Sequence, residues 1–373
     1  MRILISGATG FVGKKLGLEL VRLGHELVAI VRDKERARRE LPFPCEMIAW
    51  GETPENIDAV IHLAGESIAG KRWTKSRKEE ILQSRAGTTR ALVDLLPMIG
   101  GRKPRVMLGA SAVGYYGDRG DELLTEESLP SNSFLSDVCR RWEEELFRAE
   151  KHCPRVAAFR IGVVLGREGG ALREMLPVFK LGFGGPLGSG RQWMSWIHGR
   201  DLVGVFLHAL GNENVRGVFH AVAPNPVTNL DFTRALARSV RASAFLPVPA
   251  FALRLALGEM SELLLSSQRC AAGKLSGYSF QFPYLEKAFQ DLCDPVEGRY
   301  GRYAEEFVSE RWGAPSGSVE KRGIYALWES AEEREPLAGG VLLRRRTVYR
   351  LPFGWLSYAL AARLAREDVQ CRS

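Results

Sequence analysis

Three glycines near the start of the chain have the spacing that a bound phosphate group requires. Gly7, Gly10 and Gly13 follow a short apolar run, Ile3 to Ile5, and precede an amphipathic stretch. The first glycine permits a tight turn, the second lets backbone approach a pyrophosphate, and the third lets a helix pack closely on the sheet. The free N–H groups at the start of that helix then face the phosphates. The segment predicts a dinucleotide-binding loop made of Gly7, Thr9, Gly10, Phe11, Val12 and Gly13.

The second predicted strand, Glu26 to Val31, ends in Arg32. An arginine at this position suits the 2′-phosphate of NADP, whereas a carboxylate would suit the free ribose hydroxyl of NAD. Asp33 follows directly and is the alternative, since it offers such a carboxylate. Further arginines up to Arg39 add positive charge, and guanidinium groups match phosphate geometry. We predict NADP(H) as the cofactor; the other interpretation of this stretch is a solvated, basic helix start.

Apolar runs alternate with amphipathic stretches up to about residue 220, which is typical of βαβ units around a parallel sheet. Strands are predicted at 59–66, 105–110 and 156–164. A long helix is predicted at 74–96, with four inward-facing side chains: Ile81, Ala91, Leu92 and Leu95. We therefore predict an α/β fold with a doubly wound parallel Rossmann sheet.

Composition places the chain among ordinary globular proteins, with 45% apolar and 26% charged residues. The net charge is +8, but acidic residues are interspersed, which argues against a nucleic-acid surface and favours small anionic ligands. The six cysteines form no CxxC pair and no metal-type cluster with the six histidines, so we expect reduced thiols and no metal. No apolar run approaches the roughly 18 residues of a membrane span, and we expect a cytoplasmic protein.

Four motifs in order along the chain resemble one family. They are HLAGE at 62–66, SAVGYYG at 111–117, RIGVVLG at 160–166, and a glycine-rich loop at 184–190 that leads into Trp196–Asp201. Together they resemble the atypical, SDR39U1-like epimerase family of the extended short-chain dehydrogenases/reductases. Residues 268–294 resemble the short C-terminal domain of that family, so the resemblance covers about residues 1–295.

This resemblance implies a domain organisation and a set of cofactor contacts. It implies an NADP-binding Rossmann domain at 1–225 with substrate-loop insertions at 167–200, and a small substrate-side domain at 226–295. The implied cofactor positions are Val31, Arg32, Leu63, Ala64, Gly65, Glu80, Arg85, Ser111, Arg160 and Val164. For Glu80 and Arg85, an ordinary surface ion pair is the alternative.

The catalytic machinery departs from the superfamily. Its typical members use a serine with a Tyr–Lys pair in a YxxxK motif, in which the tyrosine moves the substrate proton. Residues 130–145, where this motif is expected, contain neither tyrosine nor lysine. Ser111 remains at the serine position, and we predict Ser111, Tyr115 and Tyr116 as the catalytic candidates. The alternatives are an aromatic pair for the two tyrosines and, for Cys139, either a thiol nucleophile or a small buried helix residue.

The loop at 182–190 is predicted to border the substrate cleft. The residues after it include the predicted substrate contacts Gln192, Trp196 and His198. The alternative is that His198 and Asp201 cap a helix that starts near Arg200. The tail, residues 296–373, resembles part of a START-like polyketide-cyclase domain, namely its last hairpin and C-terminal helix, so we expect an α+β tail.

These observations favour an NADP(H)-dependent oxidoreductase or epimerase-like enzyme acting on a small molecule. The alternative, from another class, is a non-catalytic NADPH-binding sensor or assembly factor, which the missing Tyr–Lys pair favours. A strict nucleotide-sugar epimerase ranks third, because the chain lacks its general base. Whether the protein is a monomer or a dimer stays open.

Overall fold

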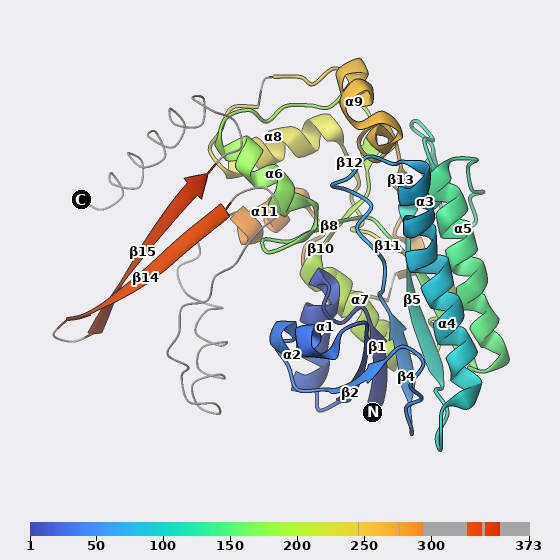
Figure 1. Cartoon of the computed structure of the whole chain (residues 1–373). Coiled ribbons are helices and arrows are strands. Elements are labelled where there is room, and N and C mark those ends of the chain that lie inside the picture. Colours follow the sequence, from blue (N-terminus) through green and yellow to red (C-terminus); the bar gives the residue numbers. More distant parts are fainter. Residues whose placement is uncertain (245, 276, 294–326, 338–339, 351–373) are drawn as a thin grey trace. The chain divides into compact units, whose positions relative to one another are not determined.

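The chain divides into two compact units, Met1–Pro295 and Val296–Ser373. A computed structural model describes residues 1–244, 246–275, 277–293, 327–337 and 340–350 (Figure 1). The predicted boundary near residue 226 falls inside the first unit and stays a prediction. In the second unit, β14 (Leu327–Leu337) pairs antiparallel with β15 (Gly340–Arg350). The rest of the START-like prediction lies outside the described residues.

A seven-stranded parallel sheet forms the centre of the first unit, which confirms the predicted Rossmann sheet. The strand order is β11-β7-β5-β4-β1-β2-β3. The chain reverses its direction of strand addition between β1 and β4, and ligands of such sheets bind at the carboxyl ends on either side of this point. The strands are β1 Arg2–Ser6, β2 Glu26–Val31, β3 Glu46–Ala49, β4 Ala59–His62, β5 Val106–Ala112, β7 Arg155–Ile161 and β11 Gly217–Ala221.

Helices lie on both faces of this sheet (Figure 1). Those of the first unit's described residues are α1 Phe11–Arg22, α2 Lys34–Glu40, α3 Lys75–Leu82, α4 Thr88–Leu95, α5 Phe134–Phe147, α6 Gly170–Lys180, α7 Gly199–Gly211, α8 Asn229–Ser239, α9 Ala250–Leu257, α10 Glu262–Leu265 and α11 Leu285–Cys293. Short strands complete it: β6 Leu123–Leu124, β8 Val163–Leu165, β9 Trp193–Met194, β10 Trp196–His198, β12 Val227–Thr228 and β13 Arg269–Cys270.

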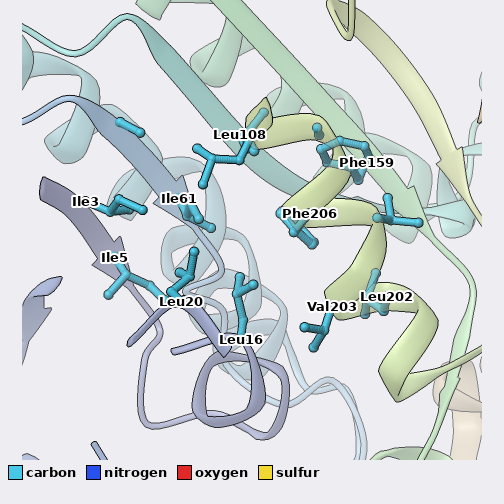
Figure 2. Close-up of a cluster of buried hydrophobic side chains, with 14 of the residues drawn as sticks. Ile3, Ile5, Leu16, Leu20, Ile61, Leu108, Phe159, Leu202, Val203 and Phe206 are labelled. Carbon is cyan, nitrogen blue, oxygen red and sulfur yellow. The ribbon is translucent and has the colours of Figure 1, made fainter. Parts of the chain in front are cut away.

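Alternation along the strands supplies two separate cores, because successive side chains of a strand point to opposite faces. Ile3 and Ile5 of β1 cluster with Leu16 of α1 and with the apolar side of α7 (Figure 2). Leu4, between them, belongs to the cluster on the other face, together with Leu146 of α5. A third cluster, built from α6, α8 and α11, forms the core of the part that follows the sheet.

Two predicted elements are interrupted in the structure. The predicted helix 74–96 consists of α3 and α4 joined by a π-helical turn, Gln83–Gly87, and Ala91 is exposed, so its inward assignment is wrong. The buried side of α4 consists of Thr89, Leu92, Val93 and Leu95, as predicted for the two leucines, and Ala91 lies outside it. The predicted strand 156–164 divides into β7 and β8 around Gly162, where a Cβ atom would lie 2.5 Å from the Ser195 carbonyl oxygen.

The described residues include neither a helix that could span a membrane nor a cluster of side chains that could hold a metal ion. No helix among them is both long and apolar enough to cross a bilayer. In the same residues, no group of three or more His, Cys, Asp or Glu side chains is arranged to hold a metal ion.

A buried histidine joins the sheet to the π-helical turn. His62, at the end of β4, lies with Nδ1 2.5 Å from Ser6 Oγ and Nε2 2.7 Å from Thr89 Oγ1. Thr89 donates its own proton to the Arg85 carbonyl oxygen, so His62 must donate to Thr89 from Nε2 and accept from Ser6 at Nδ1. Burial lowers the pKa of His62 to about 4, which keeps the ring neutral at pH 7.

We expect His62 to make folding stability fall in mild acid. The folded-state pKa lies below the ordinary value of 6.5, so the unfolded chain takes up a proton first and stability is lost as the pH falls from about 6.5 toward 4. Between pH 7 and pH 5 this one group should cost about 2 kcal/mol. Urea unfolding of wild type and His62→Gln at both pH values measures it. An equal pH dependence in the two proteins would contradict a neutral, buried His62.

Candidate functional site

Each glycine of the N-terminal loop has its own steric reason. Gly7 has φ +73°, and a Cβ atom there would lie 2.6 Å from the Leu63 carbonyl carbon. At Gly13 a Cβ atom would lie 2.2 Å from the Gly7 oxygen, so a side chain would push α1 off the loop. A Cβ atom on exposed Gly10 would meet only the Gly7 oxygen, at 3.2 Å, so this position faces open space that a pyrophosphate can fill.

The helix start behind this loop is open to an anion. Gly10 is the N-cap of α1 and offers no side-chain acceptor, so the first N–H groups of the helix stay available. Thr9, Phe11 and Val12 are half-buried, and the Phe11 ring fills the space above Gly166 and Gly169, where Cβ atoms would lie 2.1 and 2.5 Å from it. The loop, α1 and the segment after β8 therefore pack as one piece.

Near the end of β2, some arginines form ion pairs with carboxylates and others do not. The Asp33 carboxylate caps α2 by accepting from the Arg36 backbone N–H at 2.9 Å, which commits it to the helix. Arg36 pairs with Glu40 at 2.7 Å, and Arg38 is paired in the same way within the helix. Arg32 follows buried Val31, is exposed, and has no hydrogen bond or ion pair with any described residue.

A second guanidinium lies at the end of β4. Arg85, on the π-helical turn, packs over Gly65, where a Cβ atom would lie 3.3 Å from its guanidinium carbon. Its hydrogen bonds are long, 3.3 Å to Ser84 Oγ and 3.4 Å to the Ile81 oxygen. Burial lowers the pKa of Arg85 from its ordinary value, although an arginine stays protonated at neutral pH. Half-buried Leu63 and Ala64 complete this wall.

The pairing considered for Glu80 is different in the structure. Glu80 is exposed and its carboxylate lies 2.9 Å from Arg77, three residues earlier on α3. Arg85 instead faces Gly65, because the π-helical turn between the two residues rotates their side chains apart. Val164, on β8, is half-buried against the core beside α1 and α7.

A buried ion pair organises the predicted catalytic residues. Ser111, on β5, donates its hydroxyl proton to Glu143 Oε1 at 2.6 Å. Arg160, on β7, holds both oxygens of the same carboxylate, with distances of 2.8 and 2.7 Å. Burial by itself would lower the pKa of Arg160, but the hydrogen bonds and charge of Glu143 outweigh it and raise this pKa. Ser111 can accept a further hydrogen bond, but its proton is engaged.

The two tyrosines of the 111–117 motif have different environments. Tyr116 is fully buried, and its hydroxyl contacts Arg160 Nη1 at 2.7 Å and His220 Nε2. His220 Nδ1 must carry the ring proton, because it faces the Ala271 carbonyl oxygen at 2.7 Å, and the Tyr116 hydroxyl, facing Nε2, also donates to the Thr125 carbonyl oxygen at 3.0 Å. Burial raises the pKa of Tyr116 above its ordinary value. The hydroxyl is therefore saturated inside the protein and is not placed to serve a substrate.

Tyr115 is the half-exposed member of the pair. The guanidinium carbon of Arg160 lies 3.5 Å from the centroid of its ring, and its ring meets that of Tyr116 edge to face at 5.2 Å. Among the described residues, no side-chain hydrogen bond engages the Tyr115 hydroxyl. The aromatic pair is thus real, and it leaves one phenol free beside Ser111.

The segment that replaces the Tyr–Lys pair forms the start of α5. This segment contains Leu135 and Cys139 but no tyrosine or lysine. Cys139 is buried, and burial raises the pKa of its thiol to about 12. A thiol held neutral in this way is a packing residue and not a nucleophile.

The predicted substrate contacts are engaged in the fold. Gln192 donates to the carbonyl oxygens of Leu187 and Leu264, at 2.9 and 3.0 Å, and Trp196 is fully buried. His198 accepts from the Arg200 N–H at 3.1 Å and caps α7, as the alternative interpretation expected. Burial lowers the pKa of His198 to about 4. We therefore leave these three residues out of the site proposed below.

A cleft of 630 Å³ opens beside the start of α5, and no local sequence pattern predicts it because its walls come from distant segments. Phe134, next to Leu135, forms one side, and a Lys78–Glu259 ion pair crosses it. Three acidic groups and two basic ones give it a polar lining. The lining residues are Lys78, Asp118, Phe134, Arg254, Gly258, Glu259, Ser261, Glu262, Leu265 and Ser266.

Two family models and several curated proteins match the chain. The model of the NAD dependent epimerase/dehydratase family matches residues 3–221, and a domain of unknown function, DUF1731, matches residues 248–292. The chain is 39% identical over 302 residues to the Epimerase family protein SDR39U1 homolog, chloroplastic, of Arabidopsis thaliana, covering 78% of this chain and 86% of that protein. It is 38% identical to Epimerase family protein YfhF of Bacillus subtilis, covering 78% and 98%.

Among solved structures, the fold is similar to human epimerase family protein SDR39U1 (isoform 2), crystallised with NADPH. The TM-score is 0.71 at 32% identity, and the match covers 79% of this chain and 100% of the human one. UDP-glucuronic acid 4-epimerase of Bacillus cereus, crystallised with NAD, is similar in fold alone, with a TM-score of 0.61 at 20% identity.

We expect Gly10→Val to abolish dinucleotide binding while the protein still folds. The valine side chain would occupy the open space over the loop, where a pyrophosphate would pass, whereas the core lies elsewhere. Calorimetric titration with NADPH measures binding, and circular dichroism measures folding. Gly182→Ala, at a surface glycine with no atom near its Cβ position, is the control for a glycine substitution as such. Undiminished affinity in a folded Gly10→Val protein would rule out this loop.

Proposed function

We propose that this chain, which belongs to the NAD-dependent epimerase/dehydratase family and to its SDR39U1-like branch, binds NADP(H) and transfers hydride to or from a small molecule. The single observation that carries the cofactor choice is Arg32. It is the unpaired cation at the end of β2, next to the glycine loop, while the neighbouring Asp33 is committed to a helix cap.

The described residues fit the cofactor along one edge of the sheet. Gly10 leaves room for a pyrophosphate, and the open start of α1 offers N–H donors to it. Arg32 would hold the 2′-phosphate bidentately. Ala64, Gly65 and Arg85 would line the ribose and adenine side. The relative crystallised with NADPH supports the same choice.

When bound, the nicotinamide supplies hydride chemistry, and the protein supplies position and proton transfer. We assign the proton to Tyr115, because its hydroxyl is free while that of Tyr116 is saturated. The Ser111 hydroxyl donates its hydrogen bond to Glu143, so toward a substrate it acts as a hydrogen-bond acceptor, for example from a substrate hydroxyl. No lysine stands beside Tyr115 to promote its ionisation, so we expect slow turnover.

A non-catalytic NADPH-binding sensor is the second candidate. It is favoured by residues 130–145, which contain neither tyrosine nor lysine and whose Cys139 thiol is kept neutral by burial. Both candidates need the same cofactor edge, so a test of cofactor choice comes first and a test of turnover decides between them.

We expect Arg32→Ala to weaken NADPH binding by about 1–3 kcal/mol and to leave NADH binding nearly unchanged, because only NADPH carries the 2′-phosphate. Tryptophan fluorescence titrations with both cofactors measure this. Arg36→Ala is the matched control: it removes an exposed arginine from the same region, but one already paired with Glu40. We expect it to change neither affinity by more than about twofold. Equal losses for NADPH and NADH in Arg32→Ala would refute the assignment.

We expect NADPH oxidation with some members of a panel of aldehydes and ketones, and a loss of at least about tenfold in kcat for Tyr115→Phe. Tyr116→Phe is the comparison, since it removes a hydroxyl that only the fold uses. Its kcat should stay within about threefold where the protein remains folded. Turnover that survives Tyr115→Phe would move the proton to another group. Tight NADPH binding without turnover by any panel member would favour the sensor.

A further inference from the structure

Arg269, in the first unit, is stacked on a tryptophan and has no hydrogen-bond acceptor among the described residues. Arg269, on β13, lies with its guanidinium carbon 4.3 Å from the centroid of the Trp193 ring. The indole N–H of Trp193 donates to Asp121 Oδ1 at 2.8 Å, which fixes the plane on which the guanidinium rests. Stacking covers one face of the guanidinium and leaves its N–H edge free for a ligand.

The charge of Arg269 is not balanced within the described residues. No carboxylate of that part of the chain lies within 4 Å of it, it donates no hydrogen bond there, and its Nε atom is buried without a partner. Arg160 and Arg155, which are also buried, have carboxylate or carbonyl acceptors. Of its nitrogens only Nε is buried without a partner, so the Nη groups stay accessible and can donate to an anion.

Hydrogen bonds hold the strand of Arg269 beside the candidate site. Gln268, the preceding residue, donates from Nε2 to the Gly117 oxygen at 3.1 Å, directly after the turn that carries Tyr115. Ser195 accepts from the Cys270 N–H at 2.9 Å on the other side of Arg269. Trp193 lies three residues before Trp196, where β10 pairs with β8, the strand of Val164. These hydrogen bonds hold the backbone on either side of Arg269 against Gly117, which follows the turn that carries Tyr115, and against Ser195.

We propose that Arg269, supported by Trp193, is an oxyanion-binding site that holds a carboxylate or phosphate group of the substrate. This proposal rests on the proposed function, because an enzyme that uses NADP(H) must also bind a substrate. A planar fork with one free edge accepts two oxygens of one oxyanion in parallel, which gives the group a fixed orientation. The substrate class is therefore a small carboxylic acid or a phosphorylated compound.

The test is calorimetric titration of the full chain, saturated with NADPH so that the cofactor's own phosphate site is filled. Inorganic phosphate and acetate are the probes, in separate arms, which distinguishes a phosphate site from a carboxylate site. We expect one of the two to bind with a stoichiometry of one, and Arg269→Gln to weaken it at least tenfold. Arg191→Gln, an exposed arginine of the neighbouring loop, is the matched control and should change the affinity less than twofold.

Two further measurements keep the result interpretable. Arg269→Lys keeps the charge and most of the bulk but lacks the fork, so we expect a loss of at least fivefold even if Arg269→Gln folds poorly by circular dichroism. The NADPH affinity of Arg269→Gln should equal that of wild type. Equal probe affinity in wild type and both variants, or no binding of either probe by wild type, overturns the proposal. Absent NADPH binding by wild type would instead refute the proposed function.

Discussion

The buried ion pair between Arg160 and Glu143 is the interaction on which the candidate catalytic region depends. It joins β7 to α5, and through Ser111 it also joins β5. Breaking a buried pair by removing one partner costs about 3–5 kcal/mol, because the remaining charge is left without compensation. Every group around the pair is therefore constrained by it: Ser111 must donate to the carboxylate, and Tyr116 must accept from the guanidinium. The ion pair therefore fixes the hydrogen-bonding role of both side chains.

Two buried, neutral histidines also fix the hydrogen-bonding roles of their neighbours at the sheet. His62 links β1, β4 and the π-helical turn, while His220 links β11 to Tyr116 and to the Ala271 carbonyl oxygen. Burial lowers the pKa of both, so each acts as one donor and one acceptor in a fixed tautomer. The turn that presents Arg85 to Gly65 is thus attached to the sheet by hydrogen bonds and not by charge. This arrangement is suited to neutral conditions, since protonation would remove an acceptor from each link.

The sequence predicted what depends on local pattern. Short stretches of adjacent residues predicted the glycine loop, the Rossmann sheet and the departure from YxxxK, because turn sterics and strand alternation are local. The engagement of Tyr116, Gln192 and Trp196 was not predictable in this way, because their partners lie far along the chain. Tyr116, for example, contacts His220, 104 residues away. The π-helical turn was not predicted for another reason: one extra residue in a turn leaves the composition unchanged, and the apolar pattern still placed Leu92 and Leu95 inward correctly, with Ala91 alone misassigned.

Charge pairing distinguishes the arginines that hold the fold from those free to hold a ligand. Most arginines described here are paired with carboxylates or carbonyl oxygens, and a net charge of +8 then says little about where an anion binds. Some have no acceptor among the described residues; of these, Arg32 follows the strand next to the glycine loop and Arg269 is stacked on Trp193. A solvated lysine or arginine without a partner is ordinary, but the plane of the Arg269 guanidinium is fixed by stacking on Trp193 and its Nε is buried. Because a guanidinium held in a fixed plane can donate two parallel hydrogen bonds to one oxyanion, its position is a more informative feature than the total charge.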